Sequence, residues 1–100
     1  MQLHGIGHTA TATTATLIAA PGVGIRAKIQ GLHLSVSGAT TLTVGFSATN
    51  QRVYTFSAAG IFDIGLMDWE GDGNAAFTVQ SSGAVTVDST ADYVIETSPG

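Results

Sequence analysis

The residues best suited to bind a ligand lie in one acidic stretch, DWEGDGN at positions 68–74. Asp68, Glu70 and Asp72 alternate with other residues ahead of a glycine, as the first oxygen ligands do in a helix-flanked calcium loop. The position of the bidentate acid, however, holds Val79, and no helical pattern flanks the stretch. A looser Ca²⁺ site between strands and a solvated acidic turn therefore both remain open here.

Three histidines are candidates for metal binding or acid–base chemistry. His4 and His8 lie in a glycine-rich lead-in, and His33 stands on the polar side of a predicted strand. No two of them have the close spacing and the neighbouring Glu typical of a zinc site, so we expect exposed or interface histidines. Nucleophile-elbow, P-loop and dinucleotide-binding patterns are also missing from the sequence. We therefore expect neither an enzyme nor a cofactor.

The chain carries unusually little charge. Charged residues make up 10% of its 100 residues, against about 25% in ordinary soluble domains. The polar surface must consist mainly of Thr, Ser, Gln and Asn side chains and backbone, and such a surface is adhesive. We therefore expect much of it to be covered by copies of the chain or by a larger partner.

The composition also argues against several kinds of partner. The net charge is −4, and Arg26, Lys28 and Arg52 are the only Lys or Arg residues, so we expect no binding to nucleic-acid phosphates. No apolar run reaches the roughly 18 residues of a membrane-spanning helix, so we expect no membrane partner. Cysteine is absent, which excludes disulfides and thiolate metal sites.

The fold is predicted most clearly by residues 25–46, IRAKIQGLHLSVSGATTLTVGF. Apolar residues alternate with polar or small ones, which is typical of strands with one buried face. The buried positions change from odd to even numbers at Gln30-Gly31, where we expect a β-bulge. We expect a tight turn at residues 37–39 to join the two strands as an antiparallel hairpin.

Short strands and turns fill the remaining sequence. Together with the two strands above they give seven or eight short strands with turn signals about every 8–12 residues, the pattern of an antiparallel β-sandwich or jelly roll. Residues 1–100 form one predicted domain, with residues 1–14 as a candidate N-terminal arm. The further predicted strands are residues 9–20, 52–56, 61–66, 75–80, 85–87 and 92–97.

Six side chains are candidates for contact with other protein chains. Threonines of the arm need something to lie against, and two cations stand together on one strand face. A tryptophan in an acidic loop could anchor an interface or a sugar, or it could form a lid over the end of the core. The six candidates are Thr9, Thr11, Thr13, Arg26, Lys28 and Trp69.

Two segments resemble a recurrent phage-encoded β-sandwich pattern. Residues 16–46 resemble its succession of strand, turn, basic strand and hairpin, and residues 71–96, GDGNAAFTVQSSGAVTVDSTADYVIE, resemble its later hairpin and closing strand. Proteins with this pattern are small virion structural proteins of tailed bacteriophages, commonly head decoration (cement) proteins. The resemblance implies a homotrimer on the outer surface of the capsid, with the major capsid protein as its partner.

Two functional hypotheses follow from these observations. The first is a non-enzymatic virion protein that self-associates and stabilises the capsid shell. The second is a ligand- or glycan-binding β-sandwich module, such as a tail or receptor-binding tip, that uses residues 68–74 and Trp69.

Overall fold

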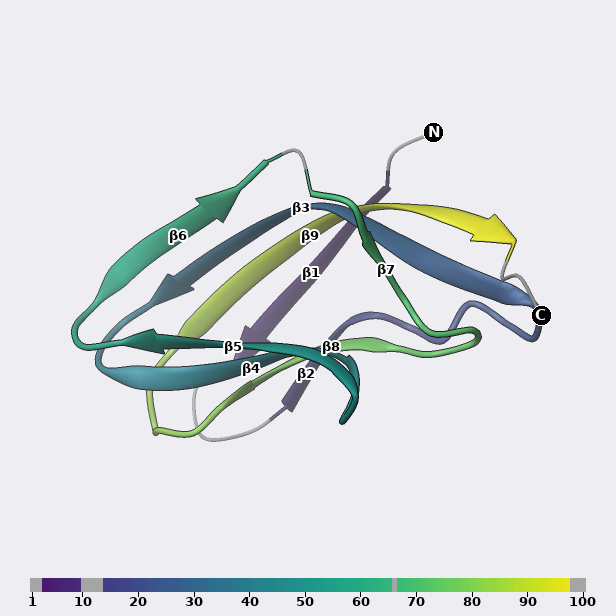
Figure 1. The fold of residues 1–100 in the computed structure, drawn as a ribbon. Helices are drawn as coiled ribbons and strands as arrows, with labels where there is room; N and C mark the ends of the chain where they lie inside the picture. Colours follow the sequence, from purple (N-terminus) through teal and green to yellow (C-terminus); the bar gives the residue numbers. More distant parts are fainter. Residues whose placement is uncertain (1–2, 10–13, 66, 98–100) are drawn as a thin grey trace.

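The fold was obtained as a computed structural model, and the structure describes residues 3–9, 14–65 and 67–97. These residues form nine β-strands. The strands build two antiparallel sheets that pack face to face, with the core between them (Figure 1). None of the described segments is a helix long and apolar enough to cross a membrane. The all-β antiparallel sandwich predicted from the sequence is confirmed, with slightly more strands than expected.

The strands of the two sheets pair in a nested order. Sheet A has the order β1 (Leu3–Thr9), β9 (Val87–Thr97), β3 (Ile25–Val36) and β6 (Gly60–Ile64), and the short β7 (Trp69–Glu70) also pairs with β3. Sheet B has the order β2 (Thr14–Ile18), β8 (Phe77–Ser81), β4 (Thr40–Ser47) and β5 (Asn50–Phe56). The pairs β1–β9, β2–β8, β3–β6 and β4–β5 are therefore nested within one another, which is the order of an eight-stranded jelly roll with β7 added.

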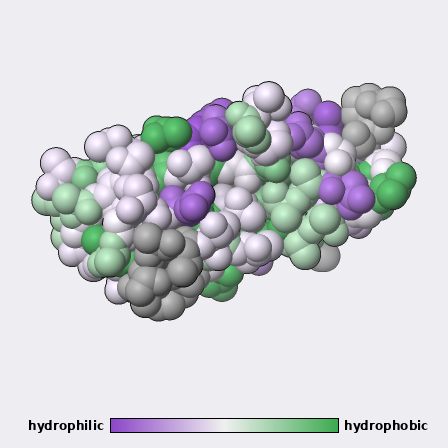
Figure 2. Space-filling model, turned by 90° about the horizontal axis from the view of Figure 1, so that it is seen from below, coloured by the Kyte–Doolittle hydropathy of each residue, from purple (hydrophilic) through white to green (hydrophobic). Residues whose placement is uncertain are grey.

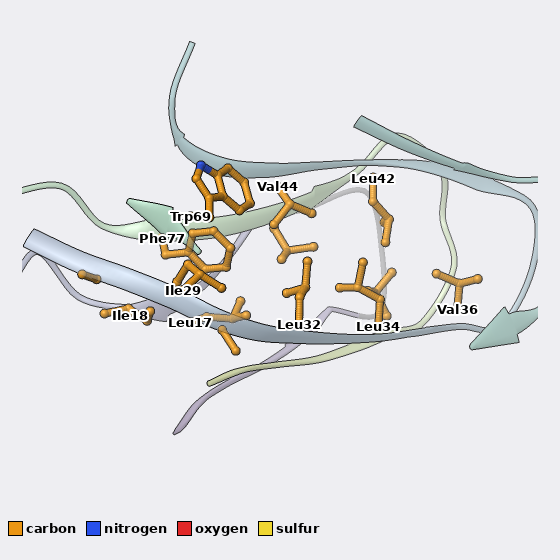
Figure 3. Packing of buried hydrophobic residues seen from close by; sticks show 14 residues of the cluster. Leu17, Ile18, Ile29, Leu32, Leu34, Val36, Leu42, Val44, Trp69 and Phe77 are labelled. Atoms are coloured by element: carbon orange, nitrogen blue, oxygen red, sulfur yellow. The ribbon is translucent and has the colours of Figure 1, made fainter. Parts of the chain in front are cut away.

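The long strand β3 keeps one face in the core along its whole length. Its register against β9 shifts between Ile29 and Gly31, which confirms the predicted bulge. Ala27 and Ile29 are buried before the shift, and Leu32 and Leu34 are buried after it. Without the extra residue, every side chain of the second half would turn to the opposite face. Figure 3 shows the apolar side chains of β3 pointing between the two sheets.

The predicted hairpin of β3 and β4 is wrong. The two strands are consecutive and their buried faces were predicted correctly, but β3 lies in sheet A and β4 in sheet B. Strand β3 pairs with β6 and β9, and β4 pairs with β5 and β8. Both strands bury one face, and alternation alone does not reveal whether two such faces lie side by side or opposite each other.

The first and last strands also differ from the prediction. Residues 3–9, suggested as part of an arm, form β1 and pair with β9. The two predicted strands at residues 85–87 and 92–97 are one continuous strand, β9. A side chain at Gly5 would place its Cβ 2.3 Å from the carbonyl oxygen of Leu17. Glycine at this position therefore lets β1 of sheet A approach β2 of sheet B at one end of the sandwich.

The acidic stretch is not a free loop but is fixed along the edge of β3. The amide of Met67 donates to Gln30 O at 2.6 Å, before β7. After β7, the amide of Gly71 donates to Ala27 O at 2.7 Å, and the segment continues antiparallel to the start of β3. We call residues 67–74 the strap. The strap covers the first half of β3, and β6 covers the second half.

Substitution of Gly5 tests this close approach of the two sheets. We expect Gly5→Ala to lower the free energy of unfolding by about 2–3 kcal/mol, because the added methyl group meets a backbone carbonyl that cannot rotate away. Gly65→Ala is the matched control, since a Cβ there has no atom within 4 Å. Urea denaturation of both variants measures the difference, and equal stabilities would contradict this role of Gly5.

Candidate functional site

Four ionisable side chains form a continuous series across the outer face of sheet A. Nδ1 of His4 on β1 lies 2.5 Å from Oδ1 of Asp92 on β9. The other carboxylate oxygen of Asp92 lies 3.2 Å from Nε2 of His33 on β3. Nδ1 of His33 lies 2.9 Å from Oδ1 of Asp63 on β6. We call these four residues the His–Asp ladder; it connects the four main strands of the sheet in their spatial order.

The register of the strands produces this ladder. His4 stands directly opposite Asp92, and His33 stands directly opposite Asp63. Asp92 is paired with Gly31 at the bulge, where an added Cβ would lie 3.0 Å from Oδ2 of Asp92. Because glycine leaves that space open, the Asp92 carboxylate can lean diagonally towards His33.

The ladder favours the protonated form of His33. Hydrogen bonds to Asp63 and Asp92 raise the pKa of His33 above its ordinary 6.5. Burial alone would raise the pKa of Asp92, but its hydrogen bonds with His4 and His33 outweigh burial and lower that pKa. Both ring nitrogens of His33 face carboxylate oxygens, so the imidazolium form can donate to both. The ladder therefore joins the four main strands of sheet A through contacts between histidine and aspartate side chains.

The two cations of β3 are paired within the chain. Arg26 contacts Glu96 on β9 at 2.7 Å through Nε and Glu70 on the strap at 3.2 Å through Nη1. Nζ of Lys28 lies 2.7 Å from Oδ1 of Asp68, which raises the pKa of Lys28 above its ordinary value. Arg26 and Lys28 were predicted as interface candidates, and the structure shows that both neutralise acids of neighbouring segments.

The three carboxylates of the calcium hypothesis contact different partners. Asp68 and Glu70 face the two cations of β3. Asp72 accepts a hydrogen bond from the Asn50 side chain at 3.2 Å. Within residues 3–9, 14–65 and 67–97, no three His, Asp or Glu side chains form a group that could hold a metal ion. In the structure, the three carboxylates of the strap are therefore engaged separately, and Ca²⁺ binding by them stays a matter for experiment.

Trp69 is a core residue rather than an exposed anchor. Trp69 is 6% exposed and packs edge-on against Phe46 and Phe77. Figure 3 shows the Trp69 ring beside Phe77 in the core. Its Nε1 donates to Asn50 Oδ1 at 2.8 Å, and the guanidinium of Arg52 lies 4.4 Å from its ring. Of the two interpretations offered by the sequence, the lid over the core fits this placement. The glycan-binding hypothesis loses the aromatic surface on which it depended.

Of the three threonine candidates, Thr9 lies within the described residues. Thr9 is the last residue of β1, where its backbone pairs with Val87. Thr11 and Thr13 lie outside the described residues. Their role as interface residues therefore stays a prediction.

The outer face of sheet B has a composition unlike that of sheet A. Of the ten charged residues in the chain, only Arg52 belongs to a strand of sheet B, and it is paired with the inward-facing Val44. In the described part of sheet B, the outward positions are uncharged. Figure 2 views this side and shows a mostly pale, weakly polar surface. The outward residues are Thr14, Thr16, Thr41, Thr43, Gly45, Gln51, Val53, Thr55, Thr78 and Gln80. We call them the uncharged face.

The comparisons with known proteins show a shared fold and no family. No protein-family model matches the sequence, and no curated protein matches it. A solved structure with a similar fold is a chain of the cyanophage Pam1 capsid asymmetric unit, with a TM-score of 0.56 and 19% identity over 92% of this chain and 83% of that chain. A chain of the virus-like particle of extra small virus from the giant freshwater prawn Macrobrachium rosenbergii aligns over 93% of this chain and 78% of that chain, with a TM-score of 0.40 and 11% identity. Only the first is similar enough to support the assignment of the fold.

The His–Asp ladder predicts a pH-dependent stability. A histidine whose pKa is raised by folding stabilises the protein fully below its unfolded pKa, and this contribution is lost as the pH rises through the folded value. Because folding raises the pKa of His33 from 6.5, the free energy of unfolding should fall as the pH rises above neutrality. His33→Gln should show a flatter profile in urea denaturation between about pH 5.5 and 8.5. An unchanged slope in this variant would count against the ladder.

The contacts of the strap predict that Ca²⁺ does not change the stability of the protein. Since Asp68, Glu70 and Asp72 are engaged separately, we expect excess Ca²⁺ to leave Tm unchanged and to give no heat in a calorimetric titration. Glu70→Gln serves as the matched variant and should behave like the wild type, apart from a stability loss below about 1 kcal/mol for an exposed ion pair. A Ca²⁺-dependent rise in Tm that this variant abolishes would contradict the expectation.

Proposed function

We propose that this protein is a non-enzymatic structural protein of a viral capsid, of the decoration (cement) type. The similarity to a chain of the cyanophage Pam1 capsid supports this proposal through the fold. Jelly rolls also occur in lectins and other proteins, so the fold by itself leaves the function open. The argument for a role in assembly therefore depends on the surface of this chain.

The observation that carries the proposal is the uncharged face of sheet B. Four adjacent strands present threonine, glutamine, glycine and valine outward, with no ionisable side chain among the described positions. Burying such a surface against protein requires no desolvation of charge, which is the largest cost of burying polar surface. A face of this kind is suited to a permanent contact with other protein.

The proposed mechanism combines self-association with docking on the shell. Copies of the chain form a homotrimer through the uncharged face, and the trimer bridges neighbouring copies of the major capsid protein on the outer surface of the virion. A closed three-fold arrangement is an ordinary symmetry for such an oligomer. Several weak contacts made by one trimer act together, so the shell is stabilised without any single strong site.

A charge placed on the uncharged face tests the proposal. Thr43 stands between Gln80 on β8 and Val53 on β5, near the centre of the face. We expect Thr43→Lys to weaken self-association by more than about tenfold, because burying an unpaired ammonium costs several kcal/mol. Sedimentation equilibrium measures the mass of the particle over a range of protein concentrations.

The control carries the same charge on the other sheet. Thr97→Lys changes an exposed residue at the end of β9, and this variant should associate as the wild type does. A wild-type protein that remains monomeric at all concentrations, or a Thr43→Lys variant that associates normally, would remove the uncharged face from the proposal.

A further inference from the structure

Strand β5 forms one edge of sheet B. Within the described residues, β4 pairs with one side of β5 and no strand pairs with its other side. From Gln51 to Phe56 the pairing with β4 runs without a register shift, so this part of the strand is regular. Four of the seven residues of β5 are exposed, namely Gln51, Arg52, Val53 and Thr55. The free side of β5 therefore offers another strand a row of backbone donors and acceptors.

The other edge strands have features that limit pairing with another chain. Strands β2 and β6 have only five residues each, and the register of β2 against β8 shifts after Thr16. Strand β1 contains two glycines and lies against β2, where Gly5 lets the two strands approach. Short strands, irregular register and glycine all weaken an edge as a template. The sequence of β5, NQRVYTF, has no glycine, proline, lysine or acidic residue.

We infer from this edge that β5 pairs antiparallel with β5 of a second copy of the chain, around a two-fold axis at Val53. Val53 is the midpoint of β5, so this register pairs all seven residues of each strand. An axis one residue away in either direction would pair only five. The two copies of sheet B then form one continuous sheet of eight strands.

The sequence of β5 is complementary to itself in this register. Its one charged residue, Arg52, faces Tyr54 of the second copy instead of another arginine. Pairs of a cation with an aromatic ring and pairs of β-branched residues stabilise neighbouring strands, whereas like charges directly opposite each other destabilise them. An axis at Arg52 would place two guanidinium groups opposite each other. The charge and the length of β5 therefore select the same register and a second copy as the partner.

The pairing also accounts for the exposure of Val53. This side chain is 58% exposed at the edge of the uncharged face. In the dimer, the Val53 side chains of the two copies stand side by side and cover part of each other. The outward side chains of β5 still point outward, so the uncharged face becomes continuous across both copies. The inference goes beyond the proposed function, because the edge of β5 and the uncharged face are different surfaces.

Cysteine variants test the pairing, because the chain contains no cysteine of its own. Opposite residues of antiparallel strands have Cα atoms about 4.5–5.5 Å apart, within the range that a disulfide requires. We expect Val53→Cys to form a disulfide-linked dimer under mild oxidation, measured by electrophoresis without reductant. A contact made by one edge strand is small, so the protein is kept at about 0.1 mM.

Gln51→Cys is the matched control for accidental cross-linking. Gln51 is exposed on the same side of the same strand. In the proposed register, however, the Gln51 residues of the two copies lie about 14 Å apart along the strands. We expect this variant to cross-link about tenfold or more slowly than Val53→Cys. A mixture of Gln51→Cys and Thr55→Cys should form the mixed dimer rapidly, identified by its mass, because these two positions are opposite each other.

Three outcomes would overturn the inference. One is the absence of a cross-link in Val53→Cys. Another is an equal rate for Val53→Cys and Gln51→Cys, which random collision would produce. The third is a mixture of Gln51→Cys and Thr55→Cys that links no faster than either variant alone.

The edge of β5 and the uncharged face can fail independently. Thr43→Lys changes β4 and leaves the edge of β5 intact, so its combination with Val53→Cys should cross-link as Val53→Cys does. Loss of the cross-link in the combined variant would overturn the inference, because the copies would then meet through the face. A β5 dimer in a protein whose sedimentation does not respond to Thr43→Lys would support the edge and remove the uncharged face from the proposed function.

Discussion

The structure depends on one constraint, which is that the twelve-residue strand β3 must keep its apolar side in the core from end to end. A single extra residue at the bulge satisfies this constraint. Without it, the side chains that follow Ile29 would alternate in the wrong phase, and the apolar ones would point away from the core. The same shift determines what lies outside. Arg26 and Lys28 face outward before the bulge and meet the strap, while His33 faces outward after it and meets Asp92. One strand therefore supports two polar clusters of different composition.

The sequence predicted which side of each strand is buried better than it predicted which strands pair with each other. Alternation identified the buried side of β3, including the phase change at Gln30-Gly31, because burial of every second residue is a local property of a strand. It did not show that the turn at residues 37–39 carries the chain from one sheet to the other. Two strands that each bury one side show the same alternation whether they are neighbours in one sheet or lie in opposite sheets across the core. The choice is made by long-range pairs, such as β1 with β9, that have no local signal.

The same distinction separates the polar residues that were interpreted correctly from those that were not. Trp69 was placed in a loop because its neighbours are acidic. In the structure those acids pair with the cations of β3, and the Trp69 side chain between them is buried in the core. His4 and His33 are 29 positions apart in the sequence and were considered as a metal group. Their connection is Asp92, and it became visible only with the strand order β1, β9, β3. Outward positions could be predicted from alternation, whereas their neighbours across strands could not.

The nesting of the strands has a consequence for how the chain reaches this structure. His4 and Asp92, which stand side by side in sheet A, are separated by 88 positions in the sequence. Strand β1 therefore cannot pair before β9 has been synthesised, and the edge of β3 that pairs with β9 also stays without its partner until then. Folds dominated by such distant pairs close slowly, since the entropy of a long loop is lost before the contacts form. The half-formed sandwich is consequently the state in which this chain is most open to chaperones and to aggregation.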